Sequence, residues 1–502
     1  MTSTTMTTKT TKTRRPFFTA LCAGLTLTLT LAQSALAIDA ARKEQGEKMA
    51  QKAIEFLRTR QDPATGGWSV PQGPEAKGRP QLPAISSLVL NGMLMQPGIS
   101  AATDNTVSKG VKYVLSFRQS DGGIYDGILP SYNTAISLSM LARVDTPEAK
   151  AAIAPAQQFL RDTQWGAPIN PGATVPGGKE APKPVTKDDP GFGGWGYGNR
   201  GRPDMSNTAF ALQGLHDSGV ASDDPAFQRA LIFLQRLQMD GKVNDQAYAK
   251  GSKQGGFVYA PGETAQTMGQ GNSWAGMIEE SLDDGTRVSR LRCYGSVTYS
   301  GFKSYIYAGL TKDDPRVQAA KKWLMNHYNP VENPGMGTNG FYYYVLVMSR
   351  SLDALGSAEL KVEGLEPLRV GVLLSKLPRG TTEAQIRELV KDAGTVRAVV
   401  MYTDTGGGRS AVVSMSKDEE AEKAETKLKS AKLNDAPLIV SRLAPGVDAP
   451  GVRDWQNDLI DALSALQNED GSFKAIDERW MENNPDLATA YALLAIQHAI
   501  RK

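Results

Sequence analysis

Two aspartates stand at the start of apolar helical segments, where a carboxyl group can do chemistry or cap the helix. Asp204 lies in the sequence Pro-Asp-Met-Ser-Asn-Thr-Ala, and Asp486 lies in Asn-Pro-Asp-Leu-Ala-Thr-Ala. A carboxyl group can act as a general acid when its surroundings keep it protonated. An aspartate just before a helix can instead accept hydrogen bonds from the first backbone N–H groups. Both residues are therefore candidate catalytic residues and candidate helix caps.

Two stretches rich in aromatic and hydroxyl side chains precede or open the same kind of helix. One contains Tyr299 and Lys303, and the other contains Tyr342. With Asn207 and Trp480, these side chains are the candidate ligand-binding residues of a central cavity. An aromatic pocket with few polar groups suits an apolar or polyisoprenoid ligand, and aromatic faces can stabilise carbocations. Tyr and Trp next to Asn, Asp and Lys suit a glycan equally well, and the alternative to both is that the aromatics fill the core.

The metal-binding residue types are scarce. The chain has two cysteines, Cys22 and Cys293, and three histidines. None of them has a partner at the spacing of a zinc site, and we expect Cys293 to be a small buried residue. The sequence thus predicts neither a metal site nor a cofactor.

A repeated turn organises most of the chain. A segment with helical periodicity ends in Gln, a Gly-rich turn with an aromatic follows, and a second helical segment opens with a Ser/Asn-Thr-Ala type of sequence. Segments before the turns are amphipathic, whereas those after them are apolar nearly all round. The pattern predicts a half-buried outer ring and a buried inner ring of helices. We expect the turn aromatics Trp68, Trp195 and Phe473 to pack between neighbouring hairpins.

A stretch near residues 365–443 has a different pattern of secondary structure, with strand-like segments between the helical ones. Its strand-like and helix-like segments follow the order β-α-β-β-α-β, which predicts a ferredoxin-like sandwich. The stretch resembles an RNA-recognition motif, but the aromatic platform positions hold Leu373, Ser410, Val412 and Met415. Base stacking needs π-faces. We therefore expect an interaction or packing module that does not bind nucleic acid.

The repeats resemble those of squalene–hopene cyclases and protein prenyltransferase β-subunits, over nearly all of the chain outside the insert. The resemblance implies an all-α (α/α)6 toroid of about six helical hairpins. Triterpene cyclases carry Asp-x-Asp-Asp, whose middle aspartate protonates an alkene. Here Asp204 matches the first acidic position, Ser206 stands in the place of the proton donor and Asn207 in the third place. If the protein is an enzyme of the cyclase or transferase type, proton-initiated cyclisation is therefore not expected.

The N-terminus has the features of an export signal. A basic region ends at Arg14 and Arg15, an apolar stretch follows, and Ala35-Leu36-Ala37 supplies small residues for a peptidase. The paired arginines also resemble a twin-arginine signal. The sequence predicts a periplasmic or extracellular protein without an integral membrane segment after signal removal. Without residues 1–37 the basic and acidic residues nearly balance, which gives no support for nucleic acid as a partner.

These features predict four parts: a signal peptide over residues 1–37, toroid repeats over 38–360, the inserted module over 361–448, and a closing repeat over 449–502. The leading hypothesis is an exported protein that binds or processes an isoprenoid-like ligand in the toroid cavity. A non-catalytic scaffold that recruits protein partners through the module is the first alternative. A carbohydrate-active lyase or hydrolase is the second, and it needs Asp204 and Asp486 to face each other across the cavity.

Overall fold

The computed structural model describes residues 38–68, 78–168, 185–198, 202–262, 272–281, 285–356, 370–378, 380–403, 409–442 and 455–501. The predicted export signal lies outside the described residues. Among the described helices, none combines the length and the apolar character needed to cross a bilayer.

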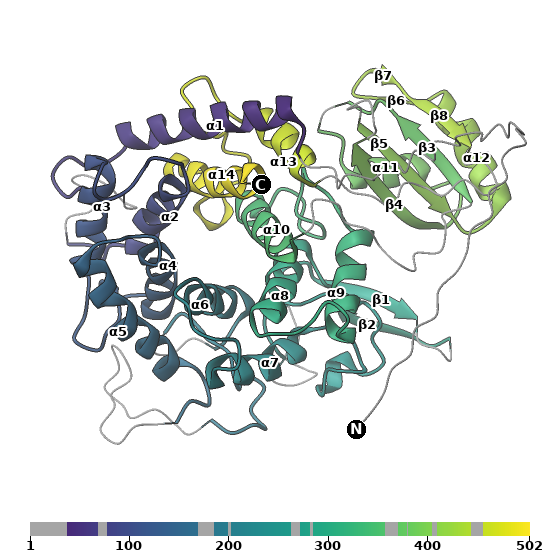
Figure 1. The fold of residues 1–502 in the computed structure, drawn as a ribbon. Helices are drawn as coiled ribbons and strands as arrows, with labels where there is room; N and C mark the ends of the chain where they lie inside the picture. The colour runs from purple at the N-terminus through teal and green to yellow at the C-terminus, as the bar shows by residue number, and fades with distance from the viewer. Residues whose placement is uncertain are drawn as a thin grey trace, which may run out of the picture. The chain divides into compact units, whose positions relative to one another are not determined.

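Twelve of the described helices alternate between two concentric layers (Figure 1). The outer layer contains α1 (Ala40–Thr59), α3 (Asn105–Leu115), α5 (Pro147–Thr163), α7 (Pro225–Leu237), α9 (Pro315–Asn326) and α13 (Trp455–Ser464). The inner layer contains α2 (Pro83–Leu94), α4 (Pro130–Leu141), α6 (Met205–Asp217), α8 (Gly295–Tyr307), α10 (Phe341–Leu355) and α14 (Pro485–Ile500). Each inner helix packs on the next in this order, and α14 packs back on α2, which closes the ring.

The burial of the helices follows the sequence pattern. In α1 the buried residues, such as Met49, Ala53 and Leu57, lie on one face, whereas α14 is buried from Asp486 to Ile500. An amphipathic helix can face water, and a helix that is apolar all round must be covered on every side. The predicted all-α (α/α)6 toroid is therefore confirmed.

The glutamine of the repeated turn joins neighbouring hairpins. The Gln164 side-chain amide donates to the carbonyl oxygen of Gly193 in its own turn and to that of Ala226 in the next outer helix, both at 2.8 Å. Gln61, Gln238 and Gln467 repeat this arrangement. Gln467 reaches Met49 of α1, so the last turn is tied to the first helix. At these four turns the glutamine links its hairpin to the next, whereas Gln119 donates only within its own turn.

The turn aromatics and glycines serve the same joint. Trp68 and Trp195 are fully buried, and their indole N–H groups donate to the carbonyl oxygens of Leu57 and Leu160. Gly193 has a positive φ of 88°, and a Cβ atom there would lie 2.0 Å from the carbonyl oxygen of Arg229 in α7. Only glycine permits that close approach. Trp68 also lies beside Gly110 of α3, and Phe473 lies beside Tyr342 of α10, so these two aromatics pack between hairpins as predicted. Trp195 is fully buried.

Two segments depart from the hairpin pattern. The connection between α7 and α8 carries the short helix η2 (Ala247–Ala249) and an antiparallel hairpin of β1 (Met277–Ser281) and β2 (Arg287–Leu291). A second short helix, η3 (Arg479–Met481), precedes α14.

The inserted module forms a sheet in the strand order β4-β5-β3-β8. Its elements are β3 (Gly371–Ser375), α11 (Glu383–Val390), β4 (Val396–Thr403), β5 (Arg409–Met415), α12 (Asp418–Lys429), the small pair β6 (Lys432–Leu433) and β7 (Ala436–Pro437), and β8 (Ile439–Arg442). The neighbouring strands are antiparallel, and the module has its own hydrophobic core. The predicted β-α-β-β-α-β order is confirmed.

Candidate functional site

Asp204 is the N-cap of α6. Its carboxylate accepts hydrogen bonds from the backbone N–H of Asn207 at 2.9 Å and from the Asn207 side-chain amide at 2.7 Å. Burial raises the pKa of Asp204 to about 6, although hydrogen bonds from Asn207 and Tyr259 act in the opposite direction. The helix-cap interpretation of Asp204 is confirmed, and Asn207 is its main partner.

Asp486 has a different role from Asp204. The side chain that caps α14 is that of Asn484, whereas Asp486 is buried and accepts a hydrogen bond from the Arg60 guanidinium at 2.8 Å. The cap interpretation is therefore wrong for Asp486. The ring also separates the two aspartates, because α6 and α14 are opposite helices in the closed order of six. Opposite helices can face each other across the interior, so the pairing of Asp204 with Asp486 that the carbohydrate alternative needs stays a prediction.

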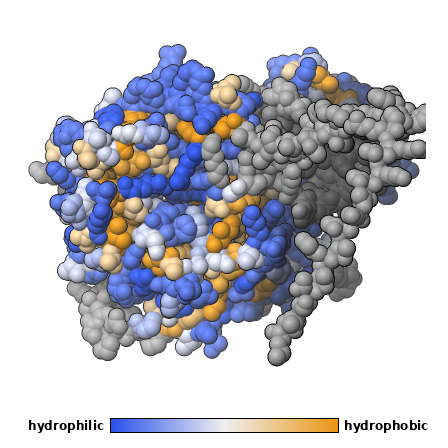
Figure 2. All heavy atoms as spheres, viewed as in Figure 1, coloured by the Kyte–Doolittle hydropathy of each residue, from blue (hydrophilic) through white to orange (hydrophobic). Residues whose placement is uncertain are grey.

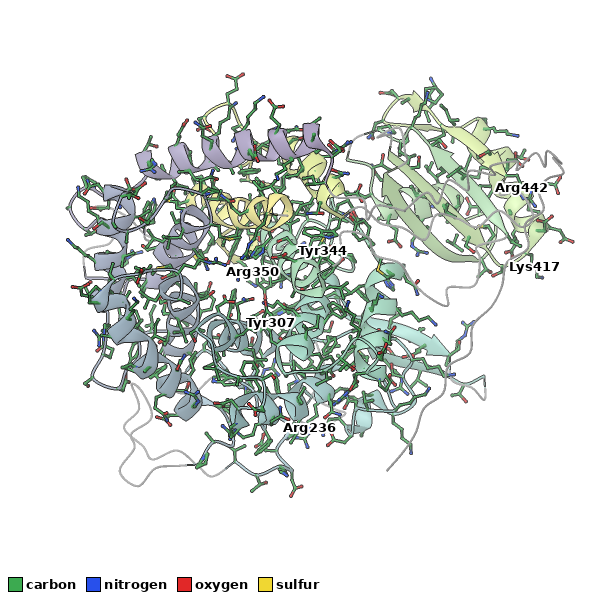
Figure 3. All side chains as sticks on the ribbon, viewed as in Figure 1. Arg236, Tyr307, Tyr344, Arg350, Lys417 and Arg442 are labelled. Atoms are coloured by element: carbon green, nitrogen blue, oxygen red, sulfur yellow. The ribbon has the colours of Figure 1, made fainter. Side chains whose placement is uncertain are left out.

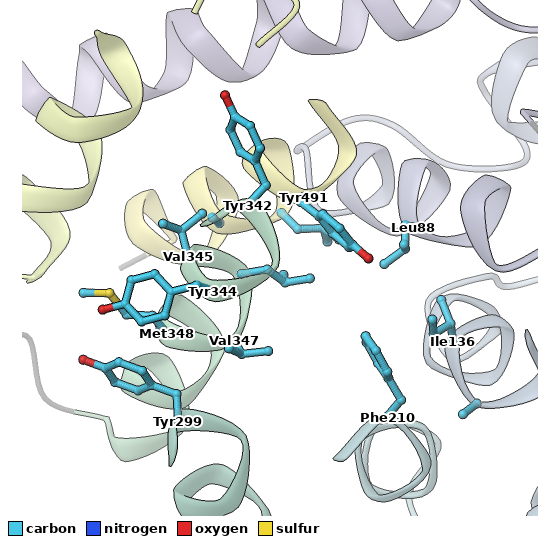
Figure 4. Close-up of a cluster of buried hydrophobic side chains, with 14 of the residues drawn as sticks. Leu88, Ile136, Phe210, Tyr299, Tyr342, Tyr344, Val345, Val347, Met348 and Tyr491 are labelled. Atoms are coloured by element: carbon cyan, nitrogen blue, oxygen red, sulfur yellow. The ribbon is translucent and has the colours of Figure 1, made fainter. Parts of the chain in front are cut away.

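Tyr299 and Tyr342 do not line the inside of the ring. Figure 4 shows both side chains pointing away from the interior, into which Phe210 and Tyr491 point. The Tyr299 ring lies 5.8 Å from that of Tyr344, and the Tyr342 hydroxyl donates to the carbonyl oxygen of Lys474 at 2.6 Å. Both are almost fully buried. The prediction that they line a cavity is corrected, because they occupy the outward faces of α8 and α10 and fill the packing between layers.

Lys303 and Trp480 lie in different parts of the ring. Lys303 of α8 is buried, and its ammonium group donates to Gln213 Oε1 at 2.5 Å. Trp480 is 44% exposed and lies beside Arg479, whose guanidinium carbon is 4.5 Å from the Trp480 ring centroid. Trp480 precedes α14, and Lys303 lies in the C-terminal half of α8. Lys303 is therefore buried near the C-terminal end of an inner helix, whereas Trp480 is exposed before the N-terminal end of another.

A continuous series of aromatic side chains, which we call the aromatic series, runs from the connections before the inner helices to the N-terminal halves of α4, α6, α10 and α14. It starts outside with Trp480, whose ring lies 6.2 Å from Trp274, and Trp274 lies 6.1 Å from Tyr259. Tyr259 is hydrogen-bonded to Tyr197, which is 41% exposed. It continues through Tyr132, Phe210, Tyr343 and Tyr491, with ring-centroid distances of 6.1, 5.6, 5.9 and 6.2 Å along the series from Tyr197.

The inner end of the aromatic series lies inside the ring. Phe210 of α6 contacts Tyr343 of α10, and the Tyr343 hydroxyl lies 3.2 Å from Ser206 Oγ. In the ring, α8 lies between α6 and α10. Likewise, Tyr132 of α4 is hydrogen-bonded to Tyr491 of α14, although α2 lies between these two helices. Contacts between non-neighbouring helices must be made across the interior. Sequence reasoning missed these residues, although each lies on an apolar helix.

Glu482 is a buried carboxyl group that the sequence did not single out. It follows η3 and accepts hydrogen bonds from the backbone N–H groups of Tyr342 and Tyr343, at 3.0 and 2.8 Å. Burial raises the pKa of Glu482 to about 7, and these hydrogen bonds act against it. Glu482 thus caps α10 from the neighbouring repeat, only four residues before Asp486.

The other end of the inner helices forms a pocket of about 530 Å³, which we call the polar pocket. Its charged lining includes Asp217 of α6, Arg350 and Asp353 of α10, and His498 of α14. Figure 3 places Arg350 near the middle of the ring, and hydrophilic residues gather over this region in Figure 2. The volume falls in the range of small-molecule sites.

Metal-ligating side chains do not form a cluster in the described residues. No group of three or more His, Cys, Asp or Glu side chains there could hold a metal ion. Burial raises the pKa of the Cys293 thiol well above its usual value. Cys293 is the small buried residue that the sequence predicted.

The platform face of the inserted module does not present aromatic side chains at the positions that the sequence singled out. Ser410 and Val412 of β5 are buried, and Leu373 of β3 is half-buried. Met415 belongs to the core of the module, beneath the helices. These positions therefore offer no π-face for a base to stack on.

Comparison with known families finds a match to the RNA recognition motif over residues 372–439. The match agrees with the fold of the inserted module. No curated protein matches the sequence.

Among solved structures, the chain is similar to the type II terpene cyclase MstE from Scytonema. A variant of MstE in complex with the product merosterolic acid A is 12% identical, with a TM-score of 0.40, over 92% of this chain and 99% of that chain. A second variant, in complex with the substrate geranylgeranyl dihydroxybenzoate, gives the same values. The apo form of MstE is 12% identical, with a TM-score of 0.38, over 90% of this chain and 98% of that chain.

Proposed function

We propose that this chain is an exported protein that binds an isoprenoid-like apolar ligand along the aromatic series, without starting a cyclisation by proton donation. The observation that carries the proposal is the continuity of the series. It connects exposed rings, Tyr197 and Trp480, to rings on the axis, Phe210 and Tyr491. A branched polyene can lie against successive aromatic faces, since each contact is apolar and needs no directed hydrogen bond.

The position at which a triterpene cyclase carries its proton-donating aspartate holds no acidic residue in this chain. Ser206 occupies the position of the proton donor, and its hydroxyl group is hydrogen-bonded to Tyr343. A serine hydroxyl is far too weak an acid to protonate an alkene. Asp204 is engaged as a helix cap, and a group with a pKa of about 6 is a poor donor to an alkene. The proposal is therefore binding, or processing that starts in another way.

The proposal is tested by titrating the purified protein with geranylgeraniol and following tryptophan fluorescence. Hexadecanol serves as the apolar ligand without isoprenoid branching, and maltohexaose tests the carbohydrate alternative. We expect saturable binding that is strongest for geranylgeraniol. Tighter binding of maltohexaose would favour the carbohydrate alternative, and no saturable binding of any probe would refute the proposal.

A matched pair of exposed residues locates the site. Tyr197→Ala removes a ring of the series that is 41% exposed, and Met277→Ala removes an equally exposed side chain in β1. Since an aromatic contact contributes about 1 kcal/mol, we expect Tyr197→Ala to weaken binding about fivefold and Met277→Ala to leave it unchanged. Equal effects of both variants would mean that the ligand does not follow the series.

The recruitment of protein partners by the inserted module stays a prediction. It is tested separately, by comparing the partners captured by the full chain and by a chain with substitutions on the exposed faces of α11 and α12.

A further inference from the structure

The polar pocket lies at the opposite end of the inner helices from the aromatic series. Along α10, Tyr343, Val347 and Arg350 follow one another at spacings of four and three residues, and therefore share a face. Tyr343 belongs to the aromatic series, and Arg350 lines the polar pocket. The inner face of this helix thus changes from aromatic to charged along its length.

Arg350 is a buried cation whose donors are not used by the described residues. Its side chain is only 5% exposed, yet no described residue forms a hydrogen bond or ion pair with it. A guanidinium group carries five N–H donors in a fixed planar arrangement. Buried donors are nearly always paired in native proteins. No Arg350 nitrogen is among the fully buried unpaired atoms of the described residues, so its donors face the pocket and are available to an acceptor that enters it.

The acceptors of the pocket are already engaged. Asp217 accepts hydrogen bonds from Ser139 and, at 2.7 Å, from the Gln213 side chain. Asp353 lies 2.8 Å from His498 Nδ1. Among the carboxylates of the lining, neither is within ion-pair distance of Arg350. The pocket has spare donors, while its carboxylate acceptors have partners.

The charges that face the pocket from the other helices have both signs. Arg143, just after α4, and Arg501, just after α14, add positive charge, and the buried Lys303 lies behind Gln213. The two aspartates and the C-terminal ends of the inner helices add negative charge. These negative groups reduce the cost of burying Arg350. They do not supply its N–H donors with acceptors within the described residues.

We propose that the polar pocket binds a small oxyanion, a phosphate or carboxylate group, through the guanidinium of Arg350. Both groups match the planar donor pair of arginine in a bidentate contact. The volume of about 530 Å³ admits a small organic molecule that carries such a group. The pocket is independent of the proposed isoprenoid site, because its residues lie at the other end of the helices.

The test uses the full mature chain and measures thermal stability and heats of binding with inorganic phosphate, diphosphate and citrate. Sodium chloride at equal ionic strength is the reference. We expect saturable stabilisation by at least one of these anions, and the comparison of diphosphate with citrate decides between phosphate and carboxylate. If none of them binds more tightly than chloride, the proposal is overturned.

The role of Arg350 is tested by Arg350→Met, which keeps the length of the side chain and removes its donors. We expect at least tenfold weaker anion binding and unchanged geranylgeraniol binding. Arg118→Met, which changes an exposed arginine outside the pocket, is the matched control. Equal anion affinity of Arg350→Met and the wild type would overturn the proposal.

A second measurement does not depend on the folding of a variant. Crystals of the wild-type protein soaked in tungstate should show an anomalous density peak beside Arg350, displaced by the preferred anion. An empty pocket after soaking, or a peak elsewhere only, would overturn the proposal even if Arg350→Met does not fold.

Discussion

Replacing Lys303 by methionine should stabilise the protein at neutral pH. Lys303 is 2% exposed and donates to Gln213 Oε1 at 2.5 Å, and no described carboxylate forms an ion pair with it. Burial, and then the positive charge of Arg350, lower the pKa of Lys303 from 10.5 to about 7, although Asp217 acts in the opposite direction. Methionine has nearly the same length and no charge to desolvate.

The magnitude follows from the pKa difference. Each pKa unit corresponds to about 1.4 kcal/mol, so the change from 10.5 to about 7 sets an upper limit of about 5 kcal/mol. The hydrogen bond to Gln213 that the variant loses offsets about 1–2 kcal/mol of this. We expect Lys303→Met to raise the free energy of unfolding at pH 7 by about 3 kcal/mol.

The pH dependence gives the sharper test. The folded protein has the lower lysine pKa, so between pH 7 and 10.5 the unfolded chain binds more protons at this site. The stability of the wild type should therefore rise with pH relative to Lys303→Met, and most of the difference should vanish by pH 10. Urea unfolding of both proteins at pH 7 and pH 10, in buffers without phosphate or sulfate, measures it. A variant that is less stable than the wild type at pH 7, with a difference that does not change with pH, would refute the reasoning.

Three further predictions concern the joints and the module. Gly193→Ala should destabilise the protein by several kcal/mol in urea unfolding, because the new Cβ would lie 2.0 Å from the carbonyl oxygen of Arg229. Gly219 has a similar φ and no atom within 4 Å of a built Cβ, so Gly219→Ala should cost only about 1 kcal/mol. Equal losses in the two variants would contradict the role of close approach. Burial raises the pKa of Glu482 from 4.5 to about 7. Lowering the pH from 7 to 5 should therefore stabilise the wild type by up to about 3 kcal/mol relative to Glu482→Gln. A stability difference between the two proteins that is constant with pH would count against this. The full chain should give no salt-sensitive anisotropy change with single-stranded RNA, since the described platform positions lack aromatic rings; binding that weakens as salt is added would show the module to be an RNA reader.

The repeats were predictable because one local pattern recurs along the chain. The glutamine, the glycine and the aromatic of each turn are close in sequence, and their roles are local or reach only the next hairpin. Gln164 and Trp195 illustrate this, since both form hydrogen bonds that recur at Gln61 and Trp68. The periodicity of the two helix types then placed them in the outer and inner layers.

The site was less predictable because it depends on which face of an inner helix points to the axis. An inner helix is apolar on all sides, so periodicity does not distinguish its faces. Tyr342 and Tyr343 are adjacent in sequence, but only Tyr343 reaches the interior, whereas Tyr342 packs outward against Phe473. The sequence also could not predict that the donors of Arg350 face the pocket, because this depends on which side chains pair with Asp217 and Asp353 in the fold.

The central claim, that a ligand follows the aromatic series into the ring, is tested most directly by photoaffinity labelling. A C20 isoprenoid alcohol with a terminal diazirine is irradiated with the protein, and the labelled peptides are identified by mass spectrometry. The account predicts saturable labelling of the segments that carry Tyr132, Phe210, Tyr343 and Tyr491, suppressed by unlabelled geranylgeraniol. Labelling confined to the outer helices, or labelling that unlabelled geranylgeraniol does not suppress, would contradict it.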